Sequence, residues 1–111
     1  MQIEYNHQKK CLIVTIEGEL DHHTAASVRE TIDKELFSGP AKNLIFDFEH
    51  LNFMDSSGIG VIIGRYKTVS TKGGKVIVAS ASPSVERILH LSGILKLTKV
   101  ARTRGLALEM I

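Results

Sequence analysis

The chain has 111 residues, with 14 lysines and arginines against 12 acidic residues and a formal net charge of +2. Of its residues 43% are hydrophobic and 5% are aromatic, and there is no Trp. This composition is typical of a globular protein. The weak charge and the few aromatic residues argue against nucleic-acid binding, which needs basic surfaces and stacking platforms. We therefore expect a single domain over residues 1–111.

Cysteine content and hydropathy indicate where such a protein works. The single cysteine, Cys11, cannot form an internal disulfide and fits a reducing compartment. No apolar run approaches the ~20 residues that a membrane-spanning helix needs. Residues 1–5 also lack the basic and then apolar pattern of a secretion signal. The sequence therefore predicts a cytoplasmic protein that binds neither membrane nor nucleic acid.

The first part of the chain changes from the pattern of strands to that of a helix. Residues 3–5 and 11–17 are expected to form a hairpin, and the second strand is apolar enough to be covered on both faces. Residues 25–36 then place apolar side chains three and four positions apart, which predicts an amphipathic helix. Asp21 or Thr24 is positioned to cap its start.

The remainder alternates between buried strands and helices. Residues 43–48 and 75–79 are predicted strands, and a helix is expected between a Ser82 cap and Gly93. A short strand over 97–100 and a terminal helix over 106–111 complete the chain.

Residues 58–70 are ambiguous, because their β-branched side chains favour a strand and their spacing favours a helix. A strand here would leave its neighbours without a crossover of adequate length, so we predict a helix. The predicted order is ββαβαβα with a short tail. The fold class is α/β, with a mixed, mostly parallel sheet of four to five strands packed with about four helices.

This topology brings distant loops together. Parallel strands joined by right-handed crossovers have their carboxyl ends along one edge of the sheet, where binding sites of α/β proteins gather. Loops 18–23, 49–57 and 80–82 should meet there. Asp21 and the Asp55-Ser56-Ser57 triplet are therefore predicted neighbours.

The second of these loops mixes large apolar residues with hydroxyls. We expect Leu51, Phe53 and Met54 to be buried under the sheet edge, and Asp55 or Ser56 to cap the following helix. One cap residue is enough, so a second hydroxyl is left for another role.

Gly60 and Gly64 share one face of that helix. Each costs about 1 kcal/mol relative to alanine, which indicates a close approach by another surface. Two alternatives remain open: packing against a helix of the same domain, or docking of a partner protein on a smooth, partly apolar face.

Motifs of known enzymes are incomplete. The glycines at 58, 60 and 64 miss the dinucleotide-binding spacing, and neither Ser56 nor Ser57 has the preceding glycine of a hydrolase elbow. The adjacent His22 and His23 do not form a metal-ligand pattern. Cys11 lies in an apolar strand and is expected in the core. We predict no catalytic residue, no metal and no cofactor.

A serine at the start of a helix can still act as a switch. A phosphate on Ser56 would add about −1.5 to −2 charges at a helix end that tolerates anions. No Lys or Arg occurs between Asn43 and Gly64, and Asp21 and Asp55 are expected to make this edge acidic. The added charge should therefore act outward, against a docked partner.

Residues 18–25, Gly-Glu-Leu-Asp-His-His-Thr-Ala, and residues 53–67, which contain Asp-Ser-Ser-Gly and Gly-Arg-Tyr-Lys, resemble the STAS domain family. They are most similar to its sporulation branch, the anti-sigma F factor antagonists. The resemblance implies a bacterial regulator that binds an anti-sigma factor, which is also a serine kinase, and so releases the sigma factor. Phosphorylation of the antagonist ends this binding, and a serine phosphatase restores it.

Carried over by position, the resemblance implies that Ser56 is phosphorylated, with Ser57 as the rival. The implied partner-binding residues lie in the same two segments: Asp21, His22, His23, Asp55, Ser57, Gly58, Gly60, Val61 and Gly64. Two alternatives stay open at this point. One is an antagonist in a general stress-response pathway, and the other, of a different class, is a small nucleotide-binding module that uses the three glycines.

Overall fold

The main sheet of the computed structural model, which describes residues 1–111, has five strands in the order β1-β2-β4-β6-β7. β1 pairs antiparallel with β2, and the other neighbours are parallel. This confirms the predicted hairpin and the predicted mixed, mostly parallel sheet. The strands are β1 (Gln2–Asn6), β2 (Cys11–Thr15), β4 (Asn43–Asp47), β6 (Val76–Ala79) and β7 (Lys99–Ala101).

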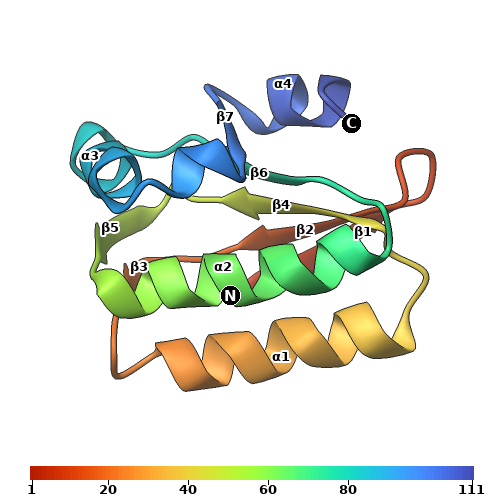
Figure 1. Ribbon diagram of the computed structural model, residues 1–111, viewed down its shortest axis with the longest axis horizontal. Coiled ribbons are helices and arrows are strands. Elements are labelled where there is room, and N and C mark those ends of the chain that lie inside the picture. The colour runs from red at the N-terminus through yellow and green to blue at the C-terminus, as the bar shows by residue number, and fades with distance from the viewer.

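Helices cover both faces of this sheet. α1 and α2 run side by side below it in Figure 1, and α4 lies above it. A short 3-10 helix follows α3 and leads into the last strand. The bounds are α1 (Ala25–Ser38), α2 (Ser56–Thr71), α3 (Pro83–Ser92), the 3-10 helix (Ile94–Lys96) and α4 (Arg104–Glu109).

Helix α2 includes residues 58–70, where the sequence was compatible with either a strand or a helix. Its start is capped by Asp55, whose side chain accepts a 2.8 Å hydrogen bond from the Ser57 N–H. Ile59, Ile62 and Val69 are buried on one face. The crossover requirement between β4 and β6 and this apolar stripe therefore outweigh the strand preference of the β-branched residues.

Two short strands were missed by the sequence analysis. β3 (Gly18–Leu20) and β5 (Leu51–Met54) pair in parallel as a separate two-stranded sheet, in segments that we predicted to be loops. Leu51 and Met54 are buried as expected, but Phe53 is 49% exposed. The expectation for Phe53 is wrong because the pairing of β5 with β3 shifts register between Leu51 and Phe53, which leaves Asn52 and Phe53 exposed between the two buried side chains.

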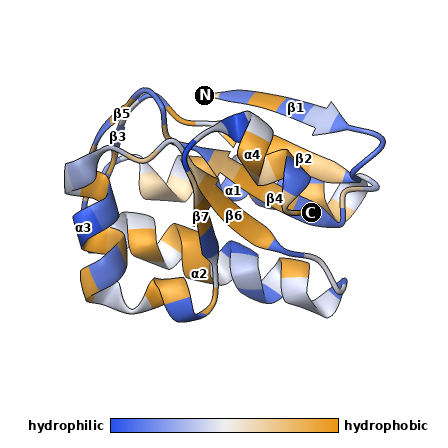
Figure 2. Cartoon of the chain, turned by 90° about the horizontal axis from the view of Figure 1, so that it is seen from above, coloured by the Kyte–Doolittle hydropathy of each residue, from blue (hydrophilic) through white to orange (hydrophobic).

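The sheet separates a large core from a small one. Alternate residues of β2 show this division, because Leu12 and Val14 face α1 and α2 whereas Cys11 and Ile13 face α4. The core on the α4 side has only six buried residues, against 22 on the other side. Figure 2 shows β6, which contributes to both, as hydrophobic along its length.

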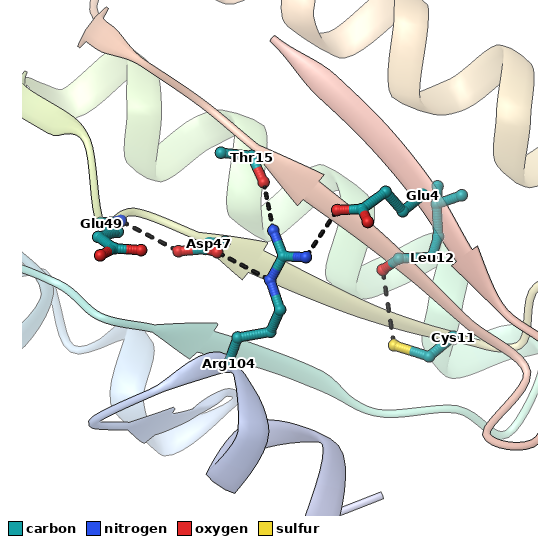
Figure 3. Close-up of polar contacts among 7 residues, drawn as sticks. All are labelled: Glu4, Cys11, Leu12, Thr15, Asp47, Glu49 and Arg104. Carbon is teal, nitrogen blue, oxygen red and sulfur yellow. Dashed lines mark hydrogen bonds and ion pairs between the residues drawn. The ribbon is translucent and has the colours of Figure 1, made fainter.

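A polar clamp fastens α4 across this small core. The Arg104 guanidinium donates to Asp47 Oδ2 at 3.0 Å, to Glu4 Oε2 at 2.6 Å and to Thr15 Oγ1 at 2.8 Å (Figure 3). Partial burial disfavours the charged guanidinium and lowers its pKa. The hydrogen bonds to Glu4 and Asp47 and the charges of these two carboxylates outweigh burial, so the pKa of Arg104 is raised. One side chain thus joins α4 to three strands.

The buried thiol of Cys11 should make the folded state less stable at alkaline pH. Burial raises its pKa from 9.0 to about 12, against a smaller opposing effect of the Ile45 backbone. The folded state keeps the proton that the unfolded chain loses above about pH 9, so the contribution to stability is full below that pH and declines toward pH 12. We expect the free energy of unfolding to fall by about 1.4 kcal/mol between about pH 8 and pH 10 from this group alone.

Urea unfolding of the wild type and of Cys11→Ala at both pH values measures this loss. The alanine variant starts less stable because it leaves a small cavity, but it lacks the thiol-dependent decline. Parallel pH profiles for the two proteins would contradict the assigned protonation of Cys11.

Candidate functional site at the start of helix α2

The segments before α1 and α2 meet in space. The Asp55 N–H donates to the carbonyl oxygen of Leu20 at 3.3 Å, directly beside the paired strands β3 and β5. The first turns of α1 and α2 lie at the same end of the molecule (Figure 1). The predicted proximity of Asp21 and Asp55–Ser57 is therefore confirmed. The third predicted loop meets the second at its first residue, because Ser80 and Ala81 line a groove with Glu49, but this groove is separate from the one that contains Ser57.

The two serines have different surroundings. Ser56, the first residue of α2, is exposed, whereas Ser57 is half-buried and its N–H is bound to Asp55. Asp55 is half-buried, and its carboxylate is directed to the helix that it caps. The outward hydroxyl that we expected beyond the cap is therefore best matched by Ser56.

The side chain of Asp21 forms hydrogen bonds with the neighbouring backbone. Its side chain is buried, and Oδ1 accepts hydrogen bonds from the N–H groups of His23 at 2.8 Å and Thr24 at 3.1 Å. Burial favours the neutral acid, but these two hydrogen bonds outweigh it and lower the pKa of Asp21. The sequence analysis expected an acidic edge at Asp21 and Asp55. In the structure both carboxylates are bound to backbone N–H groups: Asp55 caps α2, and Asp21 holds the turn that presents His22 and His23.

A groove lies between the first turns of α1 and α2, and we call it the α1–α2 groove. Its volume is about 470 Å³. Residues of α1 and of the turn before it form one wall, and residues of α2 form the other: His22, Ala25, Ala26 and Arg29, then Ser57, Gly60 and Val61. The groove joins His22, Ser57, Gly60 and Val61, which the resemblance assigned to one site, and adds small alanine side chains between them.

Arg29 lines the α1–α2 groove and was not among the residues that the sequence analysis assigned to the site. The segment between Asn43 and Gly64, which contains both serines, has no Lys or Arg. Arg29 lies outside that segment but shares the groove with Ser57. Its side chain is exposed and takes part in none of the ion pairs of the molecule. No spacing rule links Arg29 with Ser57, because the two residues lie on different helices.

The three glycines of α2 have different environments. A Cβ at Gly58 would meet the Met54 side chain and lie 2.9 Å from the carbonyl oxygen of Leu20, so glycine is needed there for close packing. A Cβ at Gly60 or at Gly64 would meet nothing within 4 Å. Packing against a helix of the same domain, one of the two alternatives for this pair, is therefore wrong.

The metal-ligating side chains and the remaining helices of the chain do not form a second candidate site. No three His, Cys, Asp or Glu side chains lie close enough together to hold a metal ion. The rings of His22 and His23 contact each other edge to face, with centroids 4.4 Å apart. None of the helices is both long and apolar enough to span a bilayer.

Comparison with known proteins agrees with this geometry. The family model of the STAS domain matches residues 2–107. A Paenibacillus polymyxa protein named anti-sigma F factor antagonist is 42% identical over 100 residues, which are 90% of this chain and 86% of that protein.

Two solved structures extend the likeness. The unphosphorylated form of the anti-sigma factor antagonist SpoIIAA has a TM-score of 0.84 and 32% identity, over 98% of this chain and 93% of the other. The phosphorylated form of SpoIIAA, a Bacillus cell fate determinant, has a TM-score of 0.74 and 31% identity, over 98% and 96%. The match spans almost the whole chain, so it includes the segments before α1 and α2 and the sheet behind them. The chain belongs to the STAS domain family.

Proposed function

We propose that the chain is an anti-sigma factor antagonist that works as a non-catalytic protein switch. In its unmodified form it binds an anti-sigma factor and so frees the sigma factor. Phosphorylation of Ser56 by the anti-sigma factor, acting as a serine kinase, ends the binding, and a serine phosphatase restores it. The single observation that carries the proposal is an exposed serine at the first position of α2, beside a groove that the domain leaves uncovered.

Exposure favours Ser56 over Ser57 as the modified residue. Transfer of the γ-phosphoryl group of ATP to a serine oxygen needs access for in-line attack, releases ADP and gives up the hydroxyl proton to a base of the kinase. Ser56 is open to solvent, whereas Ser57 is half-buried in the α1–α2 groove. The two forms of SpoIIAA named above support phosphorylation as the type of control.

The docking surface proposed here consists of the α2 face with Gly60 and Gly64, the residues around Ser56, and the turn with His22 and His23. Val61, which was expected on this surface, is only 3% exposed and lies at its base. Gly58 and Asp21 support this surface from within, as positioning residues. The similarity to a sigma F antagonist at 42% identity favours the sporulation branch over the stress-response branch.

Mass spectrometry after incubation with the cognate anti-sigma factor and ATP tests the modification site. One phosphoryl group on Ser56 is expected, with none on Ser56→Ala. Label on Ser57 alone would move the site by one residue, and label on neither serine would overturn the proposal.

Replacing a glycine on the open face of α2 should stabilise the fold and weaken binding of the partner. Gly60→Ala is expected to raise the free energy of unfolding by about 1 kcal/mol, because the new methyl group has room and alanine favours a helix. The same methyl group would hold a partner away from the helix and weaken binding about tenfold. Urea unfolding and calorimetric titration measure the two effects. Gly58→Ala is the contrasting variant, since it should destabilise the fold. Full binding by Gly60→Ala would remove this face from the docking surface.

A further inference from the structure

The α1–α2 groove contains an unbalanced positive charge. Arg29 and Asp33 are four residues apart on α1, a spacing at which arginine and aspartate commonly pair. Here Asp33 instead faces α2, where its Oδ1 lies 2.9 Å from Nε of Arg65. Arg29 is left without an acidic partner, and no acidic residue lines the groove.

Arg65 strengthens this imbalance. It is 6% exposed, and its contact with Asp33 lacks hydrogen-bond geometry, so its buried Nε and Nη1 have no hydrogen-bond partner. Burial lowers the pKa of Arg65, Asp33 opposes that effect, and the charge of Arg29 adds to it. The one carboxylate at the seam between the two helices therefore contacts Arg65, and the charge of Arg29 stays uncompensated.

We infer that the α1–α2 groove receives an acidic side chain, Asp or Glu, of the bound anti-sigma factor, and that Arg29 pairs with it. This inference rests on the function proposed above and names the chemistry of the partner at that site. Arg29 is exposed and unpaired, and its planar guanidinium suits a carboxylate. The neighbouring walls, Ala25, Ala26 and Gly60, leave room for an incoming side chain.

The partner's carboxylate is favoured over a phosphate on this chain as the occupant. Ser56, the proposed modification site, does not line the groove, whereas Ser57 does. A carboxylate arriving with the partner would neutralise Arg29 only in the complex. Arg29 would then contribute to the affinity for the anti-sigma factor without being required for the fold.

Calorimetric titration of the anti-sigma factor with the unmodified wild type, Arg29→Gln, Arg29→Lys and Arg29→Glu tests this pairing. We expect Arg29→Gln to weaken binding about tenfold and Arg29→Glu about a hundredfold or more, because the latter places two negative charges together. Arg29→Lys should recover part of the loss. Raising the salt concentration should weaken the wild type more than Arg29→Gln.

Lys34→Gln is the matched control, since it removes the same charge from an exposed position of the same helix and should bind like the wild type. None of the Arg29 variants should lower the unfolding midpoint, because Arg29 makes no ion pair in the free chain. Equal binding by the wild type and Arg29→Gln would overturn the inference and leave the proposed function standing. Absence of binding by the wild type would overturn both.

Discussion

Replacing Ser56 with aspartate is expected to weaken binding to the anti-sigma factor about a hundredfold or more, which corresponds to ~2.7 kcal/mol. The new carboxylate stands at the first position of α2, on the exposed side of the proposed docking surface. A charge there must lose water or face the partner unpaired, and either effect can supply this loss.

The same variant should leave the fold intact. A negative charge near the N-terminus of a helix interacts favourably with the helix dipole by about 0.3–1 kcal/mol. The unfolding midpoint of Ser56→Asp is therefore expected at or slightly above that of the wild type. Calorimetric titration and urea unfolding on the same preparation measure both effects.

Ser70→Asp is the matched control, because Ser70 is an exposed serine at the far end of the same helix. It should bind normally while losing a little stability, since the dipole has the opposite sign there. Equal weakening by the two variants would mean that added charge anywhere on α2 disturbs binding. That result would count against a specific role for Ser56.

Arg104→Met should cause a large loss in the free energy of unfolding. The substitution removes three hydrogen bonds that join α4 to β1, β2 and β4, and it leaves the buried Asp47 carboxylate without its cation. Breaking a fully buried pair costs about 3–5 kcal/mol. Because Arg104 is one-third exposed, solvent screens the interaction, and we expect about 2–3 kcal/mol.

Arg102→Met provides the comparison, because Arg102 is an exposed arginine without an ion pair two positions earlier. Its stability should stay within about 0.5 kcal/mol of the wild type. Both variants should bind the anti-sigma factor like the wild type when folded, since the clamp lies on the α4 side of the sheet. A loss of stability below 1 kcal/mol for Arg104→Met would show that the small core alone holds α4.

The features of the fold that follow a local pattern were predictable from the sequence. The helical spacing of Ile59, Ile62 and Val69 and the cap at Asp55 identified α2 even though its β-branched residues favour a strand. Parallel strand order then placed Asp21 near Asp55, because it fixes which strand ends share an edge. These inferences needed only periodicity, capping and connection rules.

Features that depend on tertiary contacts were not predictable. β3 and β5 are too short to show a pattern, and they are stabilised by pairing with each other. The exposure of Phe53 follows from that pairing. The contact of Arg104 with Asp47 and the entry of Arg29 into the groove join residues that lie far apart in the chain. No spacing rule connects such positions.

For the site, the predicted meeting of the two segments is confirmed, but the arginine beside Ser57 was not anticipated. Asp55 and Asp21 were expected both to cap helices and to make this edge acidic, and in the structure backbone N–H groups bind both carboxylates. The groove beside Ser57 is instead positive through Arg29. A phosphate on Ser56 therefore adds charge to a surface where the proposed partner already brings its own carboxylate.

Release of the sigma factor tests the central claim most directly. Fluorescence anisotropy of a labelled sigma factor, bound to its anti-sigma factor, would be followed while the unmodified chain or the chain phosphorylated on Ser56 is added. We expect the anisotropy to fall to the value of free sigma factor with the unmodified chain and to stay high with the phosphorylated one. Equal release by both forms, or release by neither, would contradict it.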